Sequence, residues 1–179
     1  QLKTAGELDP LSLIIRTNIG WLRYYQRDFP GAIAAYQEVL QTDPNFYPAH
    51  AKLWVAYALQ GRQPEAGREL DEIFRLGHDE DLVERISRQA QPAGAQGLFR
   101  AKLIGYANSG HFTTYEKATC LAIAGEKHAA LETLKKAESQ KDSWLVYAGV
   151  DPAFDSLRSS PEFQELLADL HLPGQHAEN

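Results

Sequence analysis

Six histidines and one cysteine are the residues of this sequence whose side chains most often bind metals or act as nucleophiles. A zinc site needs such residues in close pairs, for example two histidines four positions apart on one helix. The histidines instead fall on different predicted elements, at positions 50, 78, 111, 128, 171 and 176, and Cys120 has no second cysteine to pair with. We therefore predict no metal site, no cofactor and no disulfide bond within the chain.

Patterns typical of catalysis are also missing from the sequence. No glycine-rich loop leads into a lysine followed by serine or threonine, and no Gly-x-Ser-x-Gly segment occurs. Neighbouring carboxylates such as Asp71 and Glu72 are consecutive on a predicted helix, so they point in different directions. Cys120 lies among apolar residues and is expected to be a small buried side chain. The sequence predicts that the chain is not an enzyme.

Charge and hydropathy exclude two further classes of partner. The net charge of −6, from 18 basic and 24 acidic residues, argues against nucleic-acid binding, which needs clustered lysine and arginine. The longest apolar stretches, such as residues 54–59, fall far short of the roughly 20 residues of a membrane helix. With a single cysteine and no signal peptide before Leu2, a cytoplasmic location is expected. The start at Gln1 and the lack of methionine indicate a fragment or a processed chain.

The elements that carry these side chains repeat along the chain. An offset of 34 residues pairs Ile19 with Leu53, Ala32 with Ala66, Tyr36 with Leu70 and Val39 with Ile73. This period is typical of a helix–turn–helix unit that buries its apolar face only against its neighbours. Together with Gly61 and Asp43-Pro44, these residues resemble the tetratricopeptide-repeat (TPR) family. The resemblance implies an all-α fold, a right-handed superhelix (solenoid) of helix hairpins with a C-terminal capping helix.

The same register divides the chain. Residues 1–179 are assigned to one TPR domain: 1–12 end a preceding repeat, 13–46 form repeat 1, 47–80 repeat 2, 81–110 a degenerate repeat 3, 111–141 repeat 4, and 142–179 the C-terminal cap and tail. The third repeat is shortened, because Gly61 recurs as Gly125 at less than two full periods. Trp54 departs from the family pattern, which usually has a small residue at that position.

The C-terminal ending carries a second resemblance. Residues 144–147, 151–158 and 161–163 are similar to the ending of a bacterial family in which TPR arrays follow a winged-helix, nucleotide-cyclase or kinase domain. Ser160 and Glu162 stand where that ending usually has aspartate and arginine. Serine before Pro161 still predicts a helix start, with the helix running to about Leu170. The resemblance implies that the chain is the C-terminal part of a larger bacterial regulatory protein.

The TPR resemblance also implies where a partner would bind. In TPR arrays the first helix of each hairpin lines a concave groove that holds a guest peptide or helix. Carrying the register across places six residues on this wall: Asn18, Trp21, Tyr25, Lys52, Val55 and Tyr115. The aromatic residues among them are either anchors for an apolar guest or packing residues that a preceding repeat would cover.

Two functions follow from this surface. The first is a non-enzymatic scaffold that binds a peptide or helix of a protein partner in the concave groove. The alternative is a structural module in which the N-terminal edge stacks on another copy of the chain, so that it oligomerises or orders an upstream domain.

Overall fold

The computed structural model describes residues 10–90 and 94–171, and within these ranges every regular element is a helix. The contacts divide the chain into two compact units, one that ends at Phe99 and one that begins at Arg100. The boundary lies inside helix α7 (Gly94–Ala107), which the sequence assigns to the degenerate third repeat.

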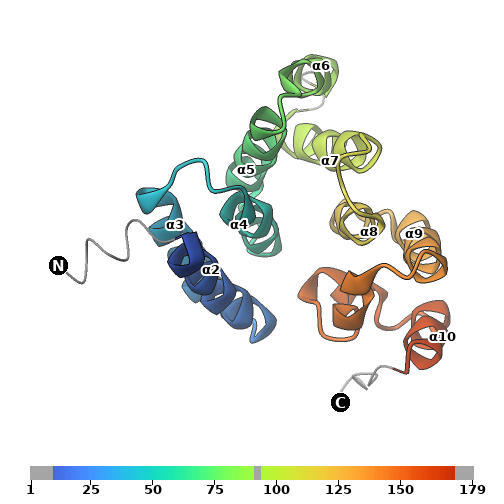
Figure 1. Cartoon of the computed structure of the whole chain (residues 1–179). Helices are drawn as coiled ribbons and strands as arrows, with labels where there is room; N and C mark the ends of the chain where they lie inside the picture. The colour runs from blue at the N-terminus through green and yellow to red at the C-terminus, as the bar shows by residue number, and fades with distance from the viewer. Residues whose placement is uncertain (1–9, 91–93, 172–179) are drawn as a thin grey trace. The chain divides into compact units, whose positions relative to one another are not determined.

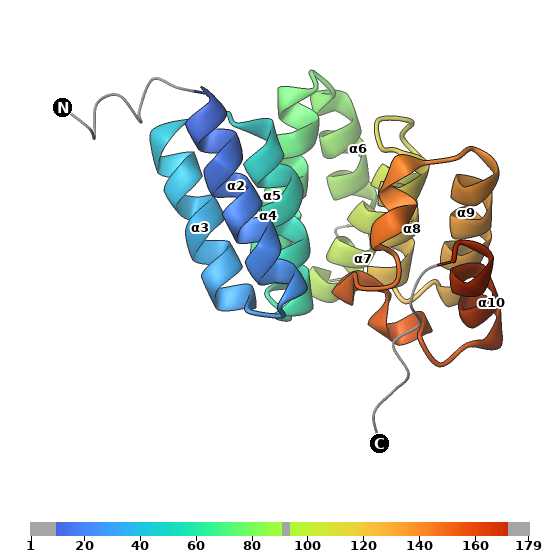
Figure 2. The same ribbon diagram turned by 60° about the horizontal axis from the view of Figure 1, so that its bottom comes forward.

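Two stacked helix hairpins build most of the first unit (Figure 1). Helix α2 (Pro10–Tyr25) pairs with α3 (Phe29–Thr42), and α4 (Tyr47–Leu59) pairs with α5 (Gln63–Leu76). Contacts between α3 and α4 join the hairpins, and α6 (Glu80–Ala90) packs on α5. Figure 2 shows α2, α3, α4 and α5 lying side by side. Short connections make the partners in each pair antiparallel, so the predicted helix–turn–helix period is confirmed in this unit.

Both hairpin turns require a residue in the left-handed backbone region. Arg27 (φ 63°) occupies this place in the first turn and Gly61 (φ 72°) in the second, one period later. Glycine adopts this conformation without steric cost, whereas a residue with a Cβ does not. Asp28 then begins α3, because its side chain accepts a hydrogen bond from the Gly31 N–H at 3.0 Å.

Gly20 allows α2 to approach α3 closely. A Cβ atom at this position would lie 2.6 Å from Cε1 of Tyr36, whose side chain is fully buried. The corresponding positions of the second hairpin hold Trp54 and Leu70, which are also buried. The larger residue therefore stands on the second helix in one hairpin and on the first helix in the other. This exchange of volume gives a physical reason for the unusual Trp54.

The second unit contains the α8 (Thr114–Ile123) and α9 (Lys127–Ser139) hairpin and a C-terminal segment packed against it. That segment consists of two short 3₁₀ helices, η2 (Ser143–Tyr147) and η3 (Pro152–Leu157), followed by α10 (Pro161–Asp169). The Ser160 side chain accepts a hydrogen bond from the Phe163 N–H at 3.2 Å, so the predicted helix start is confirmed. Phe154 and Phe163 are fully buried in the shared core.

Two aspartates hold the 3₁₀ segment to α8. Asp142 accepts hydrogen bonds from the backbone N–H groups of Trp144 (3.1 Å) and Tyr115 (3.0 Å). Asp151, which is buried, accepts one from the Ala153 N–H (2.9 Å) and one from the Tyr115 hydroxyl (2.7 Å). Each aspartate thus begins a 3₁₀ helix and also bonds to the first turn of α8.

Arg158 closes the same segment on itself. Its guanidinium group donates to the carbonyl oxygens of Gly149 (2.6 Å) and Asp151 (3.1 Å) and to Oδ1 of Asp155 (2.7 Å). The first two bonds tie the connection between η2 and η3 to the residue that follows η3.

Candidate functional site

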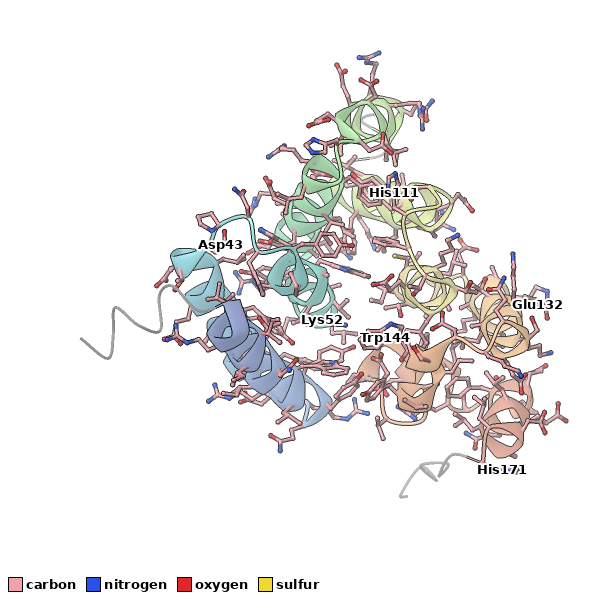
Figure 3. The ribbon with its side chains drawn as sticks, viewed as in Figure 1. Asp43, Lys52, His111, Glu132, Trp144 and His171 are labelled. Atoms are coloured by element: carbon pink, nitrogen blue, oxygen red, sulfur yellow. The ribbon has the colours of Figure 1, made fainter. Side chains whose placement is uncertain are left out.

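Five of the six predicted partner-binding residues lie in the first unit, on α2 and α4. Trp21 and Tyr25 are one turn apart on α2, with ring centroids separated by 5.3 Å. Lys52 is labelled on α4 in Figure 3, and its ammonium lies 5.1 Å from the centroid of the Trp21 ring. All three side chains are half-buried, and Asn18 is exposed one turn earlier on α2. We call Asn18, Trp21, Tyr25, Lys52 and Val55 the α2–α4 surface.

Packing beneath the α2–α4 surface fixes its aromatic rings. Tyr25 meets the ring of Tyr24 edge-on at 5.3 Å, and Tyr24, which is buried, contacts the ring of Phe29 at 5.9 Å. The Lys52 ammonium is attracted to the negative face of the Trp21 ring. Rings held in this way lose little conformational freedom when a second molecule packs on them.

Helices α2 and α4 carry basic side chains but no acidic ones. Residues 10–25 (α2) and 47–59 (α4) include Arg16, Arg23 and Lys52 but no acidic residue. The partner helices α3 and α5 carry Glu38, Glu65, Glu69, Asp71 and Glu72, together with Arg68 and Arg75 on α5. In a chain with a net charge of −6, the α2–α4 surface therefore combines apolar side chains with one positive charge, that of Lys52, which favours an acidic ligand.

A comparison with protein families fits this arrangement. The model of the tetratricopeptide repeat matches residues 24–90, the segment from the end of α2 through α6. Residues 24–90 are a tetratricopeptide-repeat segment. TPR units act in general as protein–protein interaction modules and are typically not catalytic. The matched segment includes Tyr25, Lys52 and Val55 of the α2–α4 surface. Neither the curated proteins nor the solved structures gave a match.

The sixth predicted residue, Tyr115, lies in the second unit and is 6 % exposed. Its hydroxyl donates to Asp151, and its ring meets that of Phe154 edge-on at 5.4 Å. The C-terminal 3₁₀ segment thus covers the helix face that the register predicted to be a groove wall. Because the Tyr115 side chain is committed to the core, we leave it out of the α2–α4 surface.

His50, whose partners sequence reasoning missed, joins α4 to α5. Its Nδ1 lies 2.6 Å from Oε2 of Glu69 and its Nε2 lies 2.9 Å from the Pro44 carbonyl oxygen. Both ring nitrogens face acceptors, so the protonated imidazolium, with two N–H groups, satisfies this geometry. Burial lowers the pKa of His50, but the hydrogen bonds to Glu69 and Pro44 and the charges of Glu69 and Glu72 outweigh it, and the pKa is raised.

This pair predicts a pH-dependent stability of the first TPR unit. Because the folded-state pKa of His50 lies above the unfolded value of about 6.5, its stabilising contribution is fully present below that pH. The contribution is lost as the pH rises through the raised pKa. We expect the thermal midpoint of His50→Gln to depend less on pH than that of the wild type between about pH 6 and pH 8. Exposed His128→Gln is the matched control, and equal pH profiles for wild type and His50→Gln would contradict the assignment.

The other candidate side chains are spread over both units of the chain. His78, His111, His128 and His171 are exposed, and His176 lies outside the described residues. Cys120 is fully buried, and burial together with the charge of Glu116 raises the pKa of its thiol. Across residues 10–90 and 94–171, no three metal-binding side chains come together. In the same part of the chain, no helix is long and apolar enough to cross a membrane.

Proposed function

We propose that the α2–α4 surface binds a peptide or helix of a partner protein, and that this guest combines apolar side chains with carboxylates. The observation that supports it best is the half-buried pair Trp21 and Tyr25 beside Lys52, on two helices without an acidic residue. An apolar guest side chain would pack on the rings, and a guest carboxylate would meet the Lys52 ammonium. Aromatic anchors of this kind dominate the energy of many interfaces.

Electrostatics adds selectivity to this proposal. The positive charge of Lys52 attracts an acidic guest during encounter and disfavours a basic one. Binding is therefore expected to weaken as salt concentration rises, because exposed charges are screened.

Selection of a random peptide library on the purified chain tests the proposal. We expect the enriched peptides to contain acidic and apolar residues and to bind Trp21→Ala/Tyr25→Ala roughly tenfold or more weakly than wild type. Lys52→Glu should select fewer acidic peptides. Trp144→Ala is the matched control, because Trp144 is also a half-buried aromatic beside a second ring, Tyr147, but lies in the second unit (Figure 3). Equal affinities for the wild type and the double variant would rule out this surface.

We also propose that the chain works as the C-terminal part of a larger bacterial regulatory protein. The support is the likeness of residues 144–163 to the ending of such proteins, in which this segment closes the array. Reading the coding sequence upstream of Gln1 tests it: a winged-helix, cyclase or kinase domain is the expected result, and a stop codon directly before the chain's start would refute it.

A further inference from the structure

The outward face of α2 is apolar as well. Ile15, Ile19 and Leu22 recur at the spacing of one helix face and are 53 %, 46 % and 63 % exposed. The opposite face of α2 is buried against its neighbours through Leu13 and Tyr24. Single exposed apolar residues are common on soluble proteins, whereas three in line on one helix form a contiguous apolar patch of the kind found at interaction sites. We call Ile15, Ile19 and Leu22 the outer stripe.

Positive charge borders the outer stripe along one edge. Arg16 and Arg23 are two helical turns apart and each follows a stripe residue in sequence. The Arg23 guanidinium donates to the Gly31 carbonyl oxygen at 3.2 Å, which holds its charge beside α2. Residues 10–25 contain no acidic residue that would balance these two charges within the helix.

We propose that the outer stripe docks an amphipathic helix of a partner whose apolar face is bordered by acidic residues. The apolar spacing matches a helix laid along α2, since side chains three and four positions apart line one side of a helix. The arginine edge selects a partner with carboxylates along the facing edge. This surface is separate from the α2–α4 surface, which lies on the side of α2 that contacts α4.

A second copy of the chain is a poorer occupant on the same evidence. In a two-fold symmetric contact each α2 would meet another α2 in the antiparallel direction. If the two helices crossed at Ile19, Arg16 of each copy would lie opposite residues 22 and 23 of the other copy. Like charges would meet with no acid on either helix to separate them, which disfavours this pairing.

Two synthetic helical peptides test the proposal on the full chain. Both carry leucines at the spacing of the outer stripe; one has glutamates along the flanking edge and the other has lysines there. In fluorescence anisotropy titrations we expect the glutamate peptide to bind roughly tenfold or more tightly than the lysine peptide. Leu22→Ser should weaken binding of the glutamate peptide by roughly tenfold. Arg16→Glu/Arg23→Glu should make the chain bind the lysine peptide more tightly than the glutamate peptide.

The controls separate the outer stripe from other surfaces and from misfolding. Val146→Ser removes an equally exposed apolar side chain (59 % exposed) from the second unit and should leave both affinities unchanged. Circular dichroism verifies that each variant is folded. Equal binding of the two peptides, or no effect of Leu22→Ser, would overturn the proposal. It would also be overturned if light scattering showed a dimer that Leu22→Ser dissolves, since the occupant would then be a second copy.

Discussion

Replacing Asp151 with alanine is expected to lower the free energy of unfolding of the second unit by about 3 kcal/mol. The change removes both acceptors of a buried carboxylate. It takes this acceptor away from the buried Tyr115 side chain and takes the side-chain cap away from the Ala153 N–H at the start of η3. A hydrogen bond to a charged group contributes about 1.5–3 kcal/mol and a cap about 1 kcal/mol.

Urea denaturation followed by circular dichroism measures this loss, and hydrogen exchange of α8 and η3 locates it. Glu132→Ala is the matched control, because it removes an exposed carboxylate of the same unit that lies 3.8 Å from the Lys135 ammonium (Figure 3). Exposed pairs of this kind are worth less than about 1 kcal/mol. Tyr115→Phe removes only one of the two bonds and should cost less than Asp151→Ala. If Asp151→Ala proved no more costly than Glu132→Ala, the aspartate would not hold the C-terminal segment to α8.

Gly20→Ala is expected to destabilise the first unit by about 2 kcal/mol. The direction of this stability change is informative, because replacing glycine by alanine inside a helix otherwise stabilises the helix by about 1 kcal/mol. Here the added methyl group would lie 2.6 Å from Cε1 and 2.9 Å from Cδ1 of Tyr36. The fully buried ring cannot move aside without displacing its neighbours, so α2 and α3 must separate.

A double-mutant cycle with Tyr36→Leu isolates this clash. Tyr36→Leu alone should cost stability because it leaves a cavity, but Gly20→Ala added to it should be neutral or stabilising. Gly61→Ala is the comparison for a glycine with open space around it: no atom lies within 4 Å of its Cβ position, so only the left-handed backbone (φ 72°) opposes the change. Equal costs for Gly20→Ala with and without the Tyr36 ring would exclude contact between these two positions as the cause.

Much of the helical framework could be predicted from the sequence because local signals determine it. The 34-residue period places both hairpins of the first unit, Asp43-Pro44 ends α3 at Thr42, and Ser160 begins α10. The exchange of volume between Gly20 with Tyr36 and Trp54 with Leu70 was not predictable. The two residues of each pair lie on different helices and come together only when those helices pack. The sequence of either helix alone does not indicate the pairing.

The candidate site also contains some contacts that the sequence could predict and others that it could not. Trp21 and Tyr25 share a face of α2 because they are four residues apart, and the sequence shows this directly. Tyr115 satisfies the same helical register, but its partner Asp151 is 36 residues away. His50 and Glu69 are 19 residues apart on two helices of a hairpin. Such contacts depend on the register between helices, which helical periodicity alone does not specify.

The reactivity of Cys120 measures how often the second unit opens. Cys120 is the only cysteine of the chain, it is fully buried on α8, and burial keeps its thiol protonated by raising the pKa. A thiol reagent can therefore modify only those molecules in which the hairpin of α8 and α9 has opened. The labelling rate, divided by the rate in the unfolded chain, gives the opening equilibrium of this unit when reclosing is fast. The first unit contains no cysteine, so its opening does not change the labelling rate. Thiol labelling of the unmodified protein therefore reports on the opening of the second unit alone.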